Sequence, residues 1–167
     1  MDLVIRDAAP EDAAGIVAVL NPIIEARRFT VFDTPFTAEA ECEYISRFPA
    51  RGVFHVAVRS ANGRIVGFQN VEPFGPYTAA FDHVGTIGTY VAPDCRRQHV
   101  ASRLFEATLD AARRKGYEKF FTFVRADNPA ALQAYFAHGF REIGRARRHA
   151  RIDGRYIDEV LIERWLT

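Results

Sequence analysis

Residues 3–8 alternate apolar and polar side chains, the pattern of a strand with one buried face. Pro10, Glu11 and Asp12 then mark the start of a helix, and an apolar stripe continues it to about residue 26. A second start signal follows at Thr37, an N-cap residue that precedes glutamates near the positive end of the helix dipole. We therefore expect a strand, a helix, and a second helix over about residues 38–48.

Two β-rich runs between residues 53 and 74 are joined across Asn62 and Gly63, the residue chemistry that a tight hairpin turn prefers. Residues 83–91 predict a further strand that ends before Pro93, and a helix is expected from about 100 to 115. The nearly continuous apolar run at residues 118–126 is typical of a central strand covered on both faces.

Asn128, Pro129 and Gly139 bracket the next helix, with an N-cap, a proline at the first helical position and a glycine past the end. The remaining residues predict a long hairpin that turns at Asp153 and Gly154. This order predicts an α/β fold in which a mixed central sheet of about seven strands is flanked by four helices.

Length and composition change this picture little. At 167 residues, 49% of them hydrophobic and 26% charged, the chain has the size and core content of one globular domain, so we expect residues 1–167 to form a single domain. Lysine plus arginine number 22 against 21 aspartate plus glutamate. Because these charges nearly cancel, any binding of an anion must come from the local placement of charges and backbone groups.

The cysteines and histidines indicate neither a disulfide nor a metal site. Cys42 and Cys95 lie far apart and form no metal-ligand spacing, so we interpret them as free thiols in a reducing compartment. The histidines share no i, i+4 pair, and we expect no metal site. No basic leader precedes an apolar run and no 18 consecutive residues are apolar, so we expect a cytoplasmic protein outside the membrane.

The loop at residues 96–101 (RRQHVA) lies between a predicted strand and a predicted helix. A strand-loop-helix unit directs unpaired backbone N–H groups and the positive end of a helix dipole toward one spot. Arg96, Arg97 and Arg103 add positive charge there. The loop therefore predicts a site for a phosphate or pyrophosphate, although taken alone it is more typical of a solvated basic turn that caps a helix.

At these residues the sequence resembles the GNAT superfamily of acyl-CoA N-acyltransferases, whose pyrophosphate loop reads Gln/Arg-x-x-Gly-x-Gly/Ala. Arg96 matches the first position and Ala101 the sixth. His99 stands where the family usually has its first glycine. The resemblance implies a pyrophosphate site, and we expect the Cβ of His99 to strain the backbone or crowd the pyrophosphate.

A second segment strengthens this resemblance, because Asn128, Ala131, Tyr135, Gly139 and Phe140 match the family's Asn-x-x-Ala-x-x-x-Tyr-x-x-x-Gly-Phe pattern. A spacing of seven puts the asparagine and the tyrosine on one helix face. The resemblance implies that the asparagine contacts the pantetheine arm and that the tyrosine is the general acid for the departing thiolate. A phenol, with an unperturbed pKa of about 10, can donate a proton to a thiolate at neutral pH.

The resemblance also assigns a role to the end of the strand at residues 83–91. Thr89, Tyr90 and Val91 would bind the pantetheine amides like an added strand and offer a backbone N–H to the thioester oxyanion. The implied cofactor is acetyl-CoA, which acts as the acyl donor. The residues expected to bind it are Tyr90, Val91, Arg96, Arg97, Gln98, His99, Val100, Ala101, Ser102, Asn128 and Ala131.

The N-terminal half looks most like the phosphinothricin-acetyltransferase-like branch, which acetylates small free amines, often of amino acids or their analogues. That branch tends to carry a carboxylate base on the strand at residues 83–91, where this chain has none. The nearest ionisable candidates are Glu72 and the pair Asp82 and His83, and the sequence leaves the choice between them open.

Aromatic residues are frequent in the segments that border the acceptor cleft in this family. We expect Phe32, Phe74 and Tyr77 to bind the substrate as part of a mostly apolar pocket wall. The basic run at residues 144–155 is interpreted as a solvated hairpin face, so no nucleic-acid partner is expected.

The predicted activity is transfer of an acetyl group to a small primary amine by direct attack. The amine is deprotonated by Glu72, His83 or a water that they orient, and Tyr135 protonates the CoA thiolate. Two alternatives stay open: acetylation of a protein N-terminus or lysine, and a non-catalytic CoA-binding sensor with a degenerate pyrophosphate loop. Dimers are common in the family, so a homodimer is among the expected states.

Overall fold

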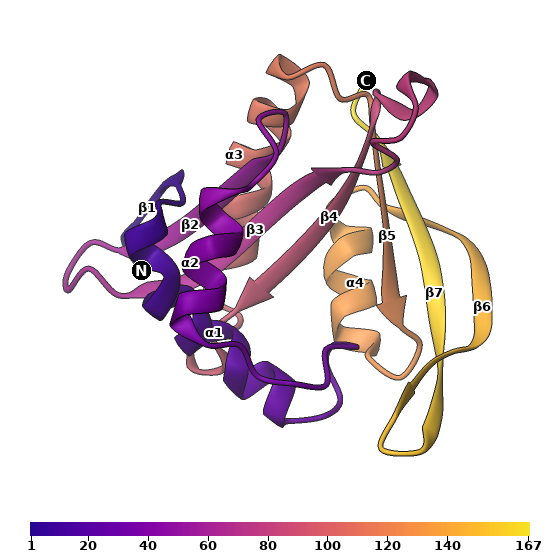
Figure 1. Cartoon of the computed structure of the whole chain (residues 1–167), viewed down its shortest axis with the longest axis horizontal. Helices are drawn as coiled ribbons and strands as arrows, with labels where there is room; N and C mark the ends of the chain where they lie inside the picture. Colours follow the sequence, from indigo (N-terminus) through magenta and orange to yellow (C-terminus); the bar gives the residue numbers. More distant parts are fainter.

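The elements follow one another along the chain in the order that the sequence predicts (Figure 1). The computed structural model describes residues 1–167. Pro49 disfavours a helical conformation at Phe48, and the second helix accordingly ends at Ser46, two residues before its predicted end. The elements are β1 Leu3–Asp7, α1 Ala13–Glu25, α2 Ala38–Ser46, β2 Val53–Arg59, β3 Ile65–Pro73, β4 Val84–Val91, α3 Val100–Arg114, β5 Lys119–Arg125, α4 Pro129–Ala137, β6 Arg141–Ile152 and β7 Arg155–Trp165.

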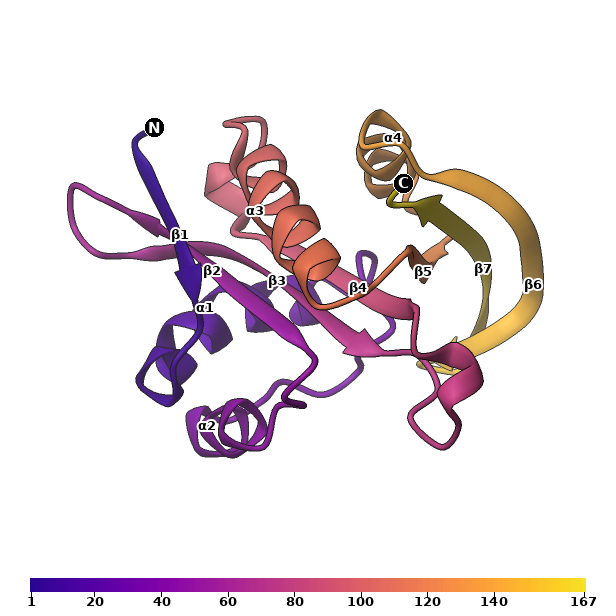
Figure 2. The ribbon, with the colours of Figure 1, turned by 90° about the horizontal axis from the view of Figure 1, so that it is seen from above.

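The seven strands form one mixed sheet in the order β1-β2-β3-β4-β5-β7-β6. Neighbouring strands are antiparallel except β4 and β5, which run parallel and are connected through α3. Figure 2 shows α1 and α2 on one face of the sheet and α3 and α4 on the other. The sheet is therefore the middle of three layers, and a site within it can be reached from both faces.

The pairing of β4 with β5 is short, and this feature positions the site. It covers only Val84–Thr86 against Lys119–Phe121, after which the two strands diverge (Figure 1). On its other side β4 remains paired with β3 through to Val91. The edge of β4 from Ile87 onward thus presents backbone N–H and C=O groups that no strand covers.

Two clusters of buried apolar side chains stabilise the sheet. One cluster packs α1 against β2 and β3 and includes Ile16 and Val66. The other packs α3 and α4 against β5 and β7 and includes Phe105 and Phe120. The second cluster also includes Val71 of β3 and Ile87 of β4, so it connects the strands on the two sides of the β4–β5 pairing. None of the helices is long and apolar enough to span a membrane.

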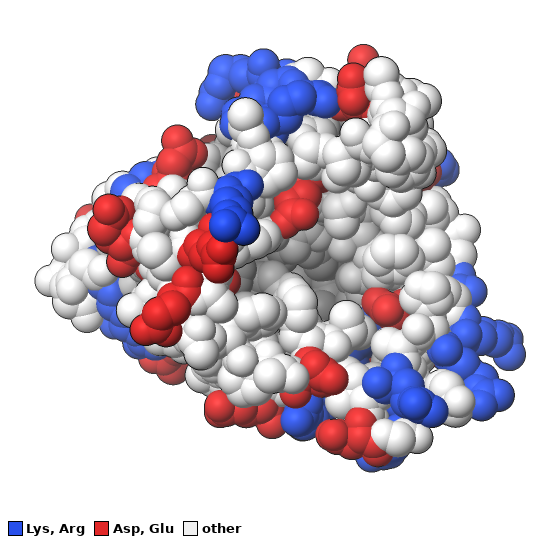
Figure 3. All heavy atoms as spheres, viewed as in Figure 1, with Lys and Arg blue, Asp and Glu red and all other residues white.

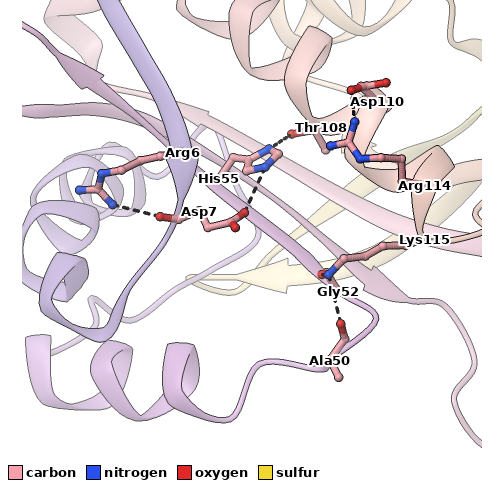
Figure 4. Close-up of polar contacts among 9 residues, drawn as sticks. All are labelled: Arg6, Asp7, Ala50, Gly52, His55, Thr108, Asp110, Arg114 and Lys115. Carbon is pink, nitrogen blue, oxygen red and sulfur yellow. Dashed lines mark hydrogen bonds and ion pairs between the residues drawn. The ribbon is translucent and has the colours of Figure 1, made fainter.

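A buried histidine connects β1, β2 and α3 outside the opening between β4 and β5 (Figure 4). His55 Nδ1 lies 3.0 Å from Thr108 Oγ1, and His55 Nε2 lies 3.3 Å from Asp7 Oδ1. A neutral imidazole meets both contacts when Nε2 carries the proton and Nδ1 accepts from the threonine hydroxyl. Burial lowers the pKa of His55, so this neutral form is the one that the folded chain favours.

Candidate functional site

A pocket of about 390 Å³ occupies the opening between β4 and β5. Its walls come from both faces of the sheet: the loop after α1, α2, β3 and β7 on one side, and α4 on the other. Figure 3 shows the hollow on the face that carries α1 and α2, with acidic atoms on its walls. The chain therefore places one cavity where two substrates can approach each other from opposite faces.

Tyr135 reaches this pocket from α4, on the side where the sequence predicts the cofactor. Its side chain is buried, and its hydroxyl is hydrogen bonded to Thr89 Oγ1 at 3.0 Å. Gln69 Nε2 donates to the same Thr89 oxygen at 2.9 Å. Burial raises the pKa of Tyr135 to about 12, so the phenol is protonated at neutral pH.

The two other residues predicted from the α4 segment have different surroundings. Ala131 lines the pocket, and its methyl group occupies little of it. Asn128 does not line the pocket: its Oδ1 accepts from the Ala131 N–H at 3.2 Å, and its Nδ2 donates to the Phe29 carbonyl at 3.3 Å. In this arrangement the asparagine caps α4 and ties the helix to the loop after α1.

The predicted pyrophosphate loop precedes α3 and has an unusual backbone. His99 is the N-cap of α3 with φ 62° and ψ 15°, and Arg97 has φ 59°. The histidine thus adopts the left-handed conformation that a glycine would supply, so the backbone is not diverted. The cost is strain, roughly 1–2 kcal/mol for a residue with a Cβ.

The side chains of this loop point mostly to solvent. The Arg96 guanidinium lies 4.4 Å from the centre of the Phe29 ring, and Gln98 Nε2 donates to the Asp94 carbonyl at 3.1 Å. Val100 is buried in the core, and Ser102 Oγ lies 3.2 Å from His138 Nε2. The free groups at this helix start are therefore backbone N–H groups with exposed basic side chains around them.

At the end of β4 the structure separates two residues that were predicted together. Tyr90 lines the pocket and stacks on Phe68 with a centroid separation of 4.8 Å. Val91 is paired with Gly67 of β3 and does not line the pocket. Alternation along β4 directs Tyr90 and Thr89 to opposite faces of the sheet, so the two residues line different sides of the pocket.

Of the candidates for the base, Glu72 is the one that the structure brings to the pocket. The Tyr44 hydroxyl donates to Glu72 Oε1, and Asn70 Nδ2 donates to the Tyr44 hydroxyl at 3.2 Å. Burial raises the pKa of the Glu72 carboxyl. The chain therefore holds a partly desolvated carboxylate by a short series of hydrogen bonds.

Asp82 and His83 lie outside the pocket, beyond the start of β4. The Asp82 carboxylate pairs with Arg51 at 3.4 Å, and the His83 carbonyl accepts from the backbone of Glu118 and Lys119. Both residues precede the part of β4 that pairs with β5, Val84–Thr86, so this paired end of the sheet separates them from the opening. The structure accordingly does not bring His83 to Tyr135.

Only one of the three aromatic residues predicted to bind the substrate lies at the pocket. Phe32 lines the pocket from the loop after α1. Phe74 instead packs edge-on against Phe81 and Phe121, at 5.2 and 5.4 Å between ring centres, and Tyr77 is 82% exposed. The segment that follows β3 thus folds around Phe81 beyond the pocket, so Phe74 and Tyr77 do not line it.

Sequence reasoning missed two charged residues that line the pocket, Arg125 and Glu159. Arg125 is buried and binds Asp127 through two hydrogen bonds of 2.8 Å, and it also donates to the carbonyls of Arg27 and Thr30. Glu159, on β7, is 7% exposed, and burial raises its pKa. The available signal was a glutamate directly before the apolar Val160 in a predicted strand.

Comparison with known proteins supports the same picture. The sequence pattern of the acetyltransferase (GNAT) family matches residues 21–140. YwnH of Bacillus subtilis is 27% identical over 99% of this chain and 100% of its own length. A phosphinothricin N-acetyltransferase of Streptomyces coelicolor is 25% identical over 96% of this chain and 94% of its own. The crystal structure of a GNAT-family acetyltransferase from Streptococcus pneumoniae, 26% identical, superimposes with a TM-score of 0.86 over 99% of this chain and all of the other.

Proposed function

Because this chain belongs to the acetyltransferase (GNAT) family and is an acyl-CoA-dependent N-acetyltransferase with acetyl-CoA as its donor, we propose that it acetylates the primary amine of a small molecule. One observation carries the proposal: a single pocket joins Tyr135 on the α4 side with Glu72 on the α2 side. The relative named for phosphinothricin acetylation, which matches almost the whole chain, supports a small acceptor.

The residues present fit acetyl-CoA, which supplies an activated thioester carbonyl. The uncovered edge of β4 from Ile87 onward offers amide partners to the extended pantetheine arm. The start of α3, with His99 already in the left-handed conformation, presents N–H groups and a dipole to the pyrophosphate. Ala131 leaves the wall of the pocket open beside them.

Thr89 and Gln69 direct the proton of Tyr135. Thr89 Oγ1 accepts from Gln69 Nε2 at 2.9 Å and from the Tyr135 hydroxyl at 3.0 Å. These bonds hold the phenol at the wall of the pocket, and rotation about its C–O bond turns the hydrogen from Thr89 to the departing thiolate. Since the raised pKa of Tyr135 keeps this hydrogen in place at neutral pH, Tyr135 serves as the acid that protonates the departing thiolate.

Glu72 removes the proton from the amine on the other face. The hydrogen bond from Tyr44 occupies Oε1 and leaves Oε2 for the substrate. A pKa raised by burial brings a carboxylate closer to the range in which it both accepts a proton and is available unprotonated. Acid and base therefore act from opposite faces of one opening, which suits direct attack without a covalent enzyme intermediate.

The loop after α1 favours a small amine over a protein. Residues 29–32 form one wall of the pocket, and Arg125 holds this loop through the carbonyls of Arg27 and Thr30. Asn21 fixes its far end through two hydrogen bonds with the backbone of Phe36, at 2.9 and 3.0 Å. A wall anchored at both ends restricts the entry of a polypeptide chain.

The test is incubation of the protein and acetyl-CoA with two panels, small primary amines and peptides with a free N-terminus or lysine. Products are identified by mass spectrometry, with acetyl-CoA alone as the control for hydrolysis. We expect acetylated small amines. Acetylated peptides without acetylated small amines would favour the protein-directed alternative, and binding of acetyl-CoA without any product would favour the sensor.

A further inference from the structure

The acidic residues of the pocket identify the kind of amine that it accepts; this inference rests on the proposed acetylation of a small amine. Val71 on β3 and Val160 on β7 belong to the core under α3 and α4. Because side chains alternate along a strand, Glu72 and Glu159 point to the other face, where the amine enters. Two carboxylates from opposite sides of the opening thus line the acceptor half of the pocket.

Glu159 has no hydrogen-bond or ion-pair partner within the protein, and it is 7% exposed. The charges of His149 and Arg125 lower its pKa, but burial raises it by more. Glu163, four residues along the same face of β7, is equally buried but pairs with Lys119 and Arg141 at 2.5 Å each. The strand therefore neutralises one buried carboxylate and leaves the other facing the pocket. A buried charge without a partner is costly unless something outside the chain supplies the partner.

The pocket offers no free cation to an acidic ligand. Arg125 is the one arginine or lysine in its lining, and Asp127 and two backbone carbonyls engage its donors. The arginines of the β6–β7 hairpin gather outside the hollow, at the lower right of Figure 3. His149 stacks on Phe123 at 5.6 Å but does not line the pocket. A substrate carboxylate would therefore meet carboxylates without compensation.

We propose that the acceptor is a small diamine, whose second ammonium group binds Glu159 while the first reaches Glu72. The acetylated nitrogen loses its charge in the reaction and the second nitrogen keeps its charge. Glu159 accordingly binds the second ammonium group equally before and after acetyl transfer, so its interaction lowers mainly the KM of the diamine. An ω-amino acid of the same length places a carboxylate at Glu159 and is disfavoured.

The test compares three acceptors of equal chain length: diaminobutane, butylamine and aminobutanoate. They end in an ammonium, a methyl and a carboxylate, respectively, so they differ in the group that faces Glu159. A series of diamines of three to six carbons then shows which length of diamine is the best acceptor. We expect kcat/KM for the diamine to exceed that for the amino acid by roughly tenfold to a hundredfold, the range of a hydrogen-bonded charge. A preference for aminobutanoate or butylamine over every diamine would overturn the inference and leave the proposed function standing.

The variant Glu159→Gln tests the residue itself. We expect it to lower the selectivity for diaminobutane over butylamine about tenfold, through the KM of the diamine, while Glu142→Gln on the exposed face of β6 leaves this selectivity unchanged. Thermal unfolding verifies that Glu159→Gln is folded, which we expect because the change removes an unpaired buried charge. An unchanged selectivity in folded Glu159→Gln contradicts the role of Glu159. No acetylation of any amine would defeat the proposed function and this inference together.

Discussion

His99 shows how a single residue can depart from a family pattern and still keep its geometry. The family usually has glycine at this position of the pyrophosphate loop, and the histidine takes the glycine-like conformation with φ 62°. A Cβ in that conformation costs roughly 1–2 kcal/mol, of which the greater freedom of an unfolded glycine offsets a part. The site is therefore retained at the expense of stability.

We predict that His99→Gly raises the free energy of unfolding by about 0.5–1 kcal/mol, because it relieves the left-handed strain. The matched control is His99→Ala, which removes the imidazole but keeps the Cβ and should give no such gain. Urea unfolding at neutral pH measures both variants against the parent. Equal stabilities for the glycine and alanine variants would show that the Cβ is not the source of strain.

At this scale the sequence predicts the residues that belong to a contiguous motif. The spacing within residues 128–140 placed Ala131 and Tyr135 on the pocket, as observed. It did not reveal Glu159, because the significance of that side chain depends on β7 lying beside β5, a pairing between distant segments. Asn128 matched the motif, yet its amide is engaged by the chain itself.

Single elements were more predictable than their pairing. The start of α4 and the turn of the last hairpin at Asp153 and Gly154 follow from local chemistry, and both occur where expected. The divergence of β4 from β5 after Thr86 cannot be recognised in the sequence of either strand, since strand pairing depends on how elements distant in sequence pack together. For the same reason the sequence wrongly predicted that Phe74 and Tyr77, in the segment after β3, line the pocket.

The contact of β1, β2 and α3 through His55 makes stability depend on pH. Burial lowers the pKa of His55, assisted by the charges of Arg114 and Lys115 at the end of α3 and opposed by Asp7 on β1 (Figure 4). The unfolded chain, with a histidine pKa of about 6.5, therefore binds a proton more readily than the folded chain. The contribution of His55 is complete above about pH 6.5 and is lost as the pH falls below it.

We predict that the free energy of unfolding of the parent falls more steeply between pH 7 and pH 5 than that of His55→Gln, which has no imidazole to titrate. Chemical unfolding at several pH values gives both slopes, and His149→Gln, at an exposed histidine outside the cluster, serves as the control with the parent slope. A His55→Gln variant that loses stability with falling pH as steeply as the parent would exclude His55 as the source.

At the scale of the whole molecule, the three-layer arrangement brings two chemistries to one opening. Tyr135 lies in the layer of α3 and α4, whereas Glu72 and Glu159 face the layer of α1 and α2. The predicted element order and the resemblance implied this architecture, and the structure bears out the seven-stranded sheet with four helices. The carboxylates that line the acceptor side could be identified only from the positions of β3 and β7 in the folded sheet.

The most direct test of this account is the turnover number of Tyr135→Phe with acetyl-CoA and an accepted amine. Because the variant lacks only the proton donor, we predict a fall in kcat of roughly a hundredfold, with the Kd for acetyl-CoA unchanged. Tyr117→Phe is the matched control: Tyr117 is buried in the same core, its hydroxyl has no partner, and it lies outside the pocket, so kcat should stay at the parent value. A Tyr135→Phe enzyme as fast as the parent would contradict the central claim.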